Sequence, residues 1–104
     1  MNTPFAASAI WVSETSGTGV LLLSKLRLQR GHLLFQRGDF NRAQFYIRRL
    51  NNSDLANAET LWLGIKVERR LDDQIAMRQL GEQLRKRFSQ SREATAYERG
   101  AFDD

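Results

Sequence analysis

The chain contains two similar stretches, residues 31–47 and 64–80, and this internal repeat restricts the fold more than any other feature. In each stretch, a glycine is followed by an apolar residue three positions later, an alanine twelve later and an aliphatic residue sixteen later. The matching positions are Gly31, Leu34, Ala43 and Ile47 in the first stretch, and Gly64, Val67, Ala76 and Leu80 in the second. A repeat of this length favours a pair of helices, with the small residues where two helices cross closely.

A repeat of about 34 residues built as helix–turn–helix is typical of tetratricopeptide repeats (TPR). We therefore expect an all-α fragment of an α–α superhelix or solenoid, with two repeats and a capping helix. The predicted helices cover residues 20–36, 40–50, 55–71, 74–88 and 92–99. The predicted N-caps are Asp39, Asp72 or Asp73, and Ser91. The second helix should bury Phe40, Ala43, Ile47 and Leu50, and the fourth should bury Ala76, Leu80 and Leu84.

The predicted organisation has four parts. Residues 1–19 form an atypical N-terminal segment and a flexible linker, 20–52 the first TPR-like hairpin, 53–88 the second, and 89–104 the capping helix and tail. Two repeats leave an apolar side without a neighbour, since about three are usually needed for stability. We expect residues 1–13, read as a short amphipathic helix, to cover the first long helix. The alternative is a homodimer, through the exposed repeat face or by exchange of the N-terminal segment at Gly17–Gly19.

The composition argues against catalysis. The chain has no Cys and one His, so disulfides, thiolate metal sites and cysteine nucleophiles are excluded. With a single His, a His-based metal site would have to borrow carboxylates, and neither a His-x-x-x-His nor a Glu-x-x-His spacing occurs. We expect no enzymatic activity, no metal and no cofactor.

Repeats of this kind hold partner proteins, and the first helix of each hairpin lines the concave side. The register of the hairpin places eight residues there: Lys25, Leu28, His32 and Phe35 from the first copy, and Leu61, Ile65, Glu68 and Arg69 from the second. An apolar strip flanked by charges is suited to an extended or helical segment of another protein. The alternative is that some of these residues contact the next turn of the solenoid instead.

Three segments resemble the C-terminal repeats of the type IV pilus biogenesis lipoproteins called PilF or PilW, which act as secretin pilotins. These segments are residues 33–46 (LLFQRGDFNRAQFY), 61–70 (LWLGIKVERR) and 83–88 (QLRKRF). The resemblance covers about residues 26–99. It implies a non-enzymatic module that assists secretin assembly or outer-membrane placement in fimbrial biogenesis and twitching motility. It also implies a location at the periplasmic face of the outer membrane, with the secretin or another pilus component as partner.

The chain departs from that family in two ways. Family members carry a signal peptide, an acylated Cys and about six repeats, whereas this sequence has no Cys and two visible repeats. We expect a fragment or a truncated reading frame, located in the cytoplasm if expressed as written, and associated with membranes only through an anchor it lacks. One alternative function is a general TPR adaptor that binds peptides. A second is an Arg-rich helical nucleic-acid binder, although acidic residues interleave with the basic ones at a net charge of +4.

Overall fold

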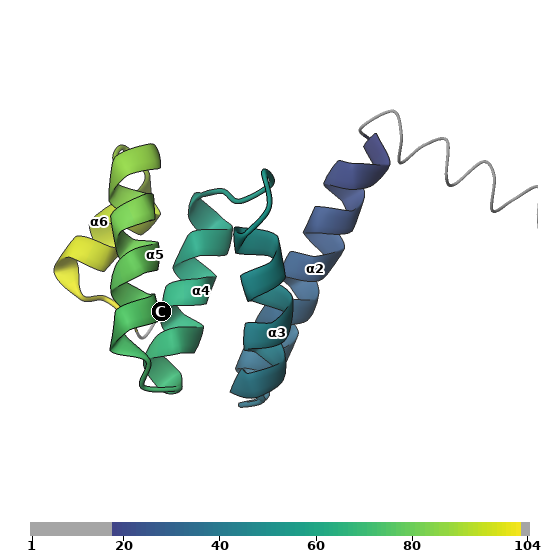
Figure 1. The fold of residues 1–104 in the computed structure, drawn as a ribbon, viewed down its shortest axis with the longest axis horizontal. Coiled ribbons are helices and arrows are strands. Elements are labelled where there is room, and N and C mark those ends of the chain that lie inside the picture. Colours follow the sequence, from purple (N-terminus) through teal and green to yellow (C-terminus); the bar gives the residue numbers. More distant parts are fainter. Residues whose placement is uncertain (1–17, 103–104) are drawn as a thin grey trace, which may run out of the picture.

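The computed structural model describes residues 18–102, which fold into α-helices and contain no strand. The helices in this range are α2 (Thr18–Gln36), α3 (Phe40–Asn51), α4 (Ala58–Arg70), α5 (Gln74–Arg87) and α6 (Arg92–Arg99). Helices α2 and α3 form one hairpin, α4 and α5 form a second, and α6 follows as the last helix (Figure 1). The predicted all-α fold of TPR-like hairpins is confirmed.

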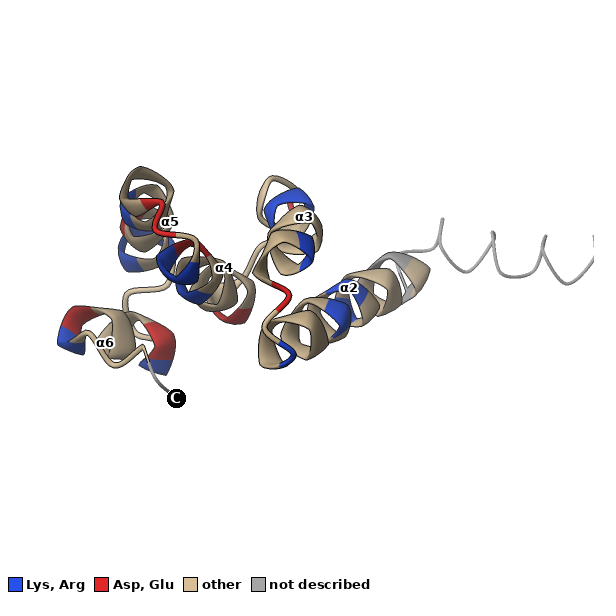
Figure 2. Ribbon diagram, turned by 90° about the horizontal axis from the view of Figure 1, so that it is seen from below, with Lys and Arg blue, Asp and Glu red and all other residues tan. Residues whose placement is uncertain are grey.

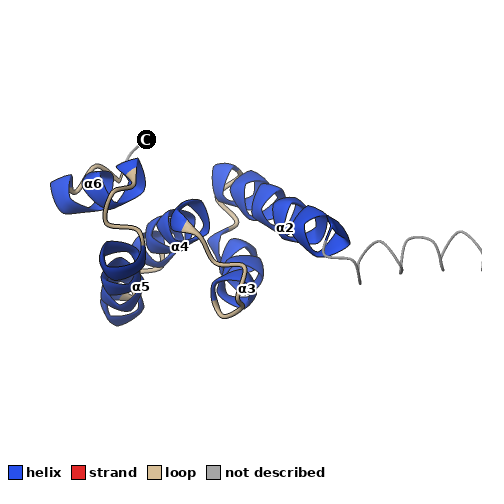
Figure 3. Cartoon of the chain, turned by 90° about the horizontal axis from the view of Figure 1, so that it is seen from above, coloured by secondary structure: helices blue, strands red, loops and turns tan. Residues whose placement is uncertain are grey.

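The helices form three layers around α4. Seen along the hairpins, α2 and α6 lie on one side of α4, and α3 and α5 lie on the other (Figures 2 and 3). Helix α4 packs against each of the other four helices. None of the helices in the described range is both long enough and apolar enough to span a membrane.

Side-chain caps set the helix starts after α2. Asp39, Asp73 and Ser91 each accept a hydrogen bond from the backbone N–H three residues later, as predicted. The third helix begins at Ala58, so the predicted start at Leu55 is wrong. A reciprocal capping box fixes this start: Asn57 Oδ1 accepts from Thr60 N at 2.9 Å, and Thr60 Oγ1 accepts from Asn57 N at 2.8 Å.

The N-terminal boundary also differs from the prediction. Helix α2 begins at Thr18, so Thr18 and Gly19 belong to the helix and not to a linker. The remainder of the predicted linker and the predicted short helix of residues 1–13 lie outside the described residues. The same holds for the predicted cover over α2 and for exchange of the N-terminal segment.

Equivalent residues of the two structural repeats are one residue further apart in the chain than the two similar sequence stretches are, and we call this distance the structural period. By this period the N-cap Asp39 corresponds to the N-cap Asp73, and the N-cap Asn57 corresponds to the N-cap Ser91. Gly38 and Asp72, also one period apart, both have left-handed backbones in the turns that end α2 and α4. Each turn is closed by the next residue, whose N–H donates to a carbonyl five residues earlier. Met77, and not Ala76, is therefore the counterpart of Ala43.

Two clusters of buried apolar residues hold the helices together. The first joins α2, α3 and α4, and the second joins α4, α5 and α6. Their members are Leu34, Ala43, Ile47, Leu63 and Val67 in the first cluster, and Leu61, Trp62, Ile65, Leu84 and Ala94 in the second. Every residue from 60 to 68 is buried because α4 contributes to both clusters.

Small residues allow close approach at some of the predicted crossings. A Cβ at Gly31 would lie 2.8 Å from the Ile47 side chain, and one at Gly64 would lie 2.6 Å from Asn51 Nδ2. Ala43 is 0% exposed within the first cluster. These three positions therefore hold helices closer together than larger side chains would allow.

Three of the residues predicted to be buried are not. Ala76 and Leu80 on α5 are only half-buried. Ala76 precedes by one residue the position that is equivalent to Ala43, so its side chain does not face the core as that of Ala43 does. Phe40 is half-buried as well. It is the first residue of α3, where its ring meets the edge of the Phe35 ring with centres 5.4 Å apart.

We predict opposite outcomes for the same substitution at the two alanines. Ala43→Leu should lower the free energy of unfolding by about 1–3 kcal/mol, because the added atoms overpack a closed helix crossing. Ala76→Leu should change it by less than about 0.5 kcal/mol, since the site is open on one side. Urea unfolding followed by circular dichroism measures both values. Equal destabilisation by the two variants would contradict the structural register.

Candidate protein-binding surface

The four residues predicted on α2 do lie along one side of that helix, since they recur every three or four positions. Lys25 is exposed, whereas Leu28, His32 and Phe35 are half-buried. Leu28 and Phe35 also pack against the first core cluster. They therefore stabilise the hairpin as well as contributing to its surface.

Three of the four residues predicted on α4 are corrected by the structure. Leu61 and Ile65 are 0% exposed and lie in the second core cluster, while Glu68 is 2% exposed. None of these three side chains lines an open surface. The reason is that α6 and α5 cover the side of α4 that carries Leu61 and Ile65. Arg69, the fourth residue, is exposed.

The structural period identifies the side of α4 that does adjoin the α2 residues. The residues one period after the α2 set are Glu59, Trp62, Lys66 and Arg69. His32 Nε2 lies 3.8 Å from Glu59 Oε2, which joins the two helices. Lys66 Nζ lies 5.5 Å from the centre of the Phe35 ring and 5.7 Å from that of Trp62. The signal for these residues was present in the sequence, in the spacing of the N-caps.

We call these eight residues the α2–α4 strip. Its members are Lys25, Leu28, His32, Phe35, Glu59, Trp62, Lys66 and Arg69.

Aromatic rings and cations alternate along the strip. Arg70 lies over the rings of Phe35 and Phe40, at 5.4 and 5.2 Å from their centres. On the side of α4 that packs with α5 and α6, Phe102 stacks on Trp62 with ring centres 5.6 Å apart. Arg69 lies 5.0 Å from the centre of the Phe102 ring. Each such cation–ring contact contributes about 0.5–1 kcal/mol at an exposed site.

A shallow hollow of about 380 Å³ lies beside the strip, between α2, α4 and α6. Its lining combines an aromatic ring with charges of both signs, from His32, Glu59, Trp62, Arg92, Glu93 and Ala96. An aromatic side chain next to charges of both signs is suited to contact with another protein. Among residues 18–102, no group of three or more metal-binding side chains comes together.

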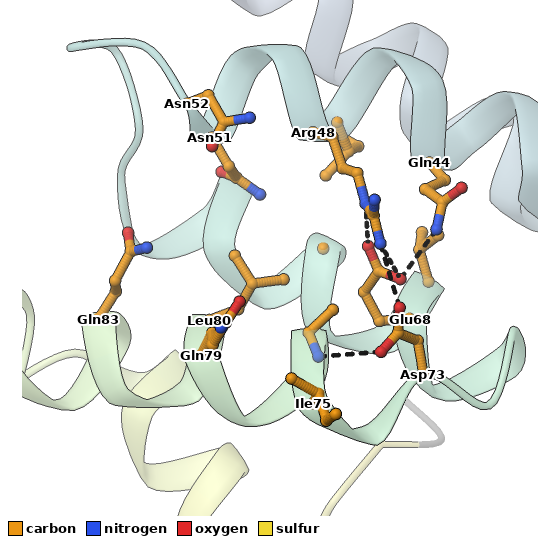
Figure 4. A pocket seen from close by; sticks show the side chains of 14 residues that line it. Gln44, Arg48, Asn51, Asn52, Glu68, Asp73, Ile75, Gln79, Leu80 and Gln83 are labelled. Atoms are coloured by element: carbon orange, nitrogen blue, oxygen red, sulfur yellow. Dashed lines mark hydrogen bonds and ion pairs between the residues drawn. The ribbon is translucent and has the colours of Figure 1, made fainter.

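Glu68 faces the opposite side of α4, where it joins α4 to α3. Its Oε2 accepts from Arg48 Nε at 2.7 Å, and its Oε1 accepts from Gln44 Nε2 at 2.9 Å and from Arg48 Nη2 at 3.2 Å (Figure 4). Arg48 Nη2 also donates to Asp73 Oδ2 at 3.3 Å. The hydrogen bond to Glu68 is the main cause that raises the pKa of the Arg48 guanidinium above its ordinary value, and burial opposes it in part. Glu68 is therefore a structural residue that links the two hairpins.

No protein-family model matches the chain, and no curated protein or solved structure shows significant similarity to it.

We predict that Glu68 and Arg48 are coupled in stability. Glu68→Ala should lower the free energy of unfolding by about 2–3 kcal/mol, because charged hydrogen bonds between the hairpins are lost. Arg48→Ala should be comparably costly, since it leaves a buried carboxylate without its main partner. Urea unfolding of the two single variants and the double variant measures the coupling. Additive effects would show that the two side chains act independently.

Proposed function

We propose that this chain is a non-enzymatic protein–protein interaction module of type IV pilus biogenesis and twitching motility. It assists the assembly of the secretin or its placement in the outer membrane. The resemblance of residues 26–99 to the pilotin repeats supports the pathway. The stacking of TPR-like hairpins supports binding as the mode of action, because such stacks present extended surfaces to other polypeptides.

The observation that carries the proposal is the continuity of the α2–α4 strip across two hairpins. His32 and Glu59 approach across the helices, and Lys66 lies between Phe35 and Trp62. Trp62 and Lys66 are each only 8% exposed and join the two helices from below the surface. A partner segment laid across α2 and α4 would therefore mainly contact the exposed or half-buried members, which are Lys25, Leu28, His32, Phe35, Glu59 and Arg69. Aromatic and arginine side chains are the residues that most often dominate binding energy at interfaces.

A general TPR adaptor is the alternative that the same strip supports. It differs in the partner and the compartment, not in the binding surface. In that case the chain would act in the cytoplasm on a peptide of another protein. The two functions are therefore separated by the identity of the protein that is retained.

We predict that the intact chain, immobilised through a tag, retains the secretin from a detergent extract of a piliated bacterium. Lys25→Glu combined with His32→Ala should lower this retention by about fivefold, because a free energy of about 1 kcal/mol is typical of residues that matter at an interface. Quantitative immunoblotting of the retained secretin gives the measurement.

The matched control is Arg78→Glu combined with Gln90→Ala, which makes similar changes at exposed positions on α5 and in the turn before α6. This control should retain the secretin fully. If the unaltered chain retains no secretin, the pilus function is wrong. If both double variants retain it equally, the secretin binds elsewhere on the molecule.

A further inference from the structure

Helix α2 is apolar on two opposite sides, whereas a surface helix usually has one apolar side and one polar side. On the inner side, Leu34 is buried in the first core cluster, and Leu28 packs against that cluster. On the outer side, Leu22, Leu26 and Leu33 are 57%, 53% and 40% exposed. At about 100° per residue, these three leucines fall within about 40° of one another around the helix axis. They form a second apolar stripe, which we call the outer leucine stripe.

The apolar surface widens at the N-terminal end of α2. Leu21 and Leu23 flank Leu22 in the chain and are 59% and 38% exposed. Three consecutive residues spread over about 200° of the helix circumference. Ser24 follows them, and its hydroxyl is already paired within the helix, since it donates to Leu21 O at 2.9 Å. This end of α2 extends past α3 (Figure 1), so its leucines face outward in several directions.

The hairpin that carries the stripe also carries most of the positive charge. Residues 18–52 contain seven Lys and Arg and one Asp, a net charge of +6, whereas residues 53–102 contain nine Lys and Arg and eight Asp and Glu, a net charge of +1. Figure 2 shows basic positions and no acidic ones along α2. Five of the seven cations make no ion pair with a carboxylate of residues 18–102. They are Lys25, Arg27, Arg30, Arg37 and Arg49.

Cations border the outer leucine stripe on both sides. Lys25 and Arg30 are exposed and lie about 60–80° from the centre of the stripe, in opposite directions around the helix. Arg30 also lines a hollow of about 530 Å³ between α2 and α3, together with Arg37, Arg42 and the exposed ring of Phe45. Long cationic side chains beside apolar surface can lay their methylene stems on it and keep their charges at its edge.

This side of α2 does not repeat the packing surface of α4. On α4, Leu63 and Gly64 meet the first hairpin, and a Cβ at Gly64 would lie 2.6 Å from Asn51 Nδ2. One structural period earlier, α2 has Gln29 and Arg30 at these positions. A long charged side chain therefore stands where close contact requires a glycine. Another helical hairpin cannot stack on α2 in the way that the second hairpin stacks on the first.

Charge argues against two further occupants. A second copy of the chain would bring a hairpin of the same charge against this one, and the two would repel each other. Residues 1–17 contain one acidic side chain, Glu14, which is too few to balance five unpaired cations. The occupant has to be strongly anionic.

The leucines then decide between anionic occupants. A nucleic acid would neutralise the cations and leave the leucines in water. An acidic helix of another protein would cover one stripe of α2, and not the arc of about 200° over which Leu21, Leu22 and Leu23 spread. An anionic lipid surface supplies negative head groups together with hydrocarbon, which can surround side chains that face in several directions.

We propose that the first hairpin lies on the surface of an anionic lipid bilayer. The outer leucine stripe enters the boundary of the acyl chains, and the neighbouring Lys and Arg side chains contact the phosphate head groups. Interfacial helices bury their apolar side by about 5–10 Å in this way, without crossing the bilayer. The contact needs no covalent lipid anchor. It is independent of the proposed function, which concerns a protein partner on the α2–α4 strip.

The test measures co-sedimentation of the whole chain with vesicles of phosphatidylcholine that contain about 30% phosphatidylglycerol. We expect binding at least about tenfold stronger than to vesicles of phosphatidylcholine alone, because the anionic head groups attract the cations. Raising the ionic strength from about 0.01 to 0.15 M should weaken this binding, since salt screens the attraction. Equal binding to the two kinds of vesicle, or no binding to the anionic ones, would overturn the proposal.

A matched pair of single variants tests the leucines. Leu22→Gln and Ile75→Gln each replace an exposed aliphatic side chain, on α2 and on α5, so both variants should fold. Leu22→Gln should weaken binding to the anionic vesicles at least about fivefold, because a leucine no longer enters the acyl boundary. Ile75→Gln should leave binding unchanged. Unchanged binding by Leu22→Gln would show that the leucines are covered by something other than lipid, and the proposal would be wrong.

A matched pair of double variants tests the charges. Arg30→Glu with Arg37→Glu should weaken binding at least about tenfold, because both cations belong to the proposed contact. Arg78→Glu with Lys86→Glu makes the same change in net charge at exposed positions on α5, and should weaken binding by less than about twofold. Equal weakening by the two double variants would mean that net charge acts without a defined surface, which contradicts the proposal.

The same preparations separate lipid from the other anionic occupants. If the chain ignores the vesicles and binds a DNA duplex or a helical peptide rich in Glu, the first hairpin serves a nucleic acid or a protein, and the proposal is wrong. Because the vesicles contain no protein, a failure to retain the secretin leaves this result unaffected.

Discussion

The fold depends on the burial of α4 between the other helices. Residues 60–68 form two complete turns with no exposed position, and the two core clusters meet in them. Leu63 and Val67 pack toward the first hairpin, whereas Leu61 and Ile65 pack toward α5 and α6. Full burial of aliphatic side chains of this size contributes about 1.5–3 kcal/mol each. The two hairpins therefore share one central helix and behave as one packed unit.

A helix surrounded on all sides has to satisfy any polar group it carries. Glu68 and Lys66 are both on α4 and both nearly covered, at 2% and 8% exposed. Glu68 is bonded to Arg48 and Gln44 on α3, and Lys66 lies against two aromatic rings. These contacts point to opposite sides of α4. The same central helix thus separates the α2–α4 strip from the charged hydrogen bonds that join α4 to α3.

Much of the fold follows from local rules that the sequence displays. Asp39, Asp73 and Ser91 cap their helices because a short polar side chain can accept from the third backbone N–H. The start of α4 was misplaced because Ser53 and Asp54 look like caps, while the reciprocal bonds of Asn57 and Thr60 decide the start. The four strip residues of α2 share one side of that helix because they follow the period of a single helix, which the sequence displays. The α4 part of the strip was not predicted correctly, because an error of one residue turns a helix by about 100°.

By itself, the sequence determined the helical class, the pairing of helices into two hairpins, most of the helix ends, and the absence of cysteine chemistry. These follow from periodicity, capping residues and composition, which act within a few residues along the chain. Only the tertiary structure decided which side of α4 is covered, which of two neighbouring registers the repeat follows, and which leucines of α2 are left exposed. Those features depend on contacts between segments far apart in the sequence. The small residues Gly64 and Ala76 suggested an alignment of the two repeats that differs by one residue from the alignment in the packed structure.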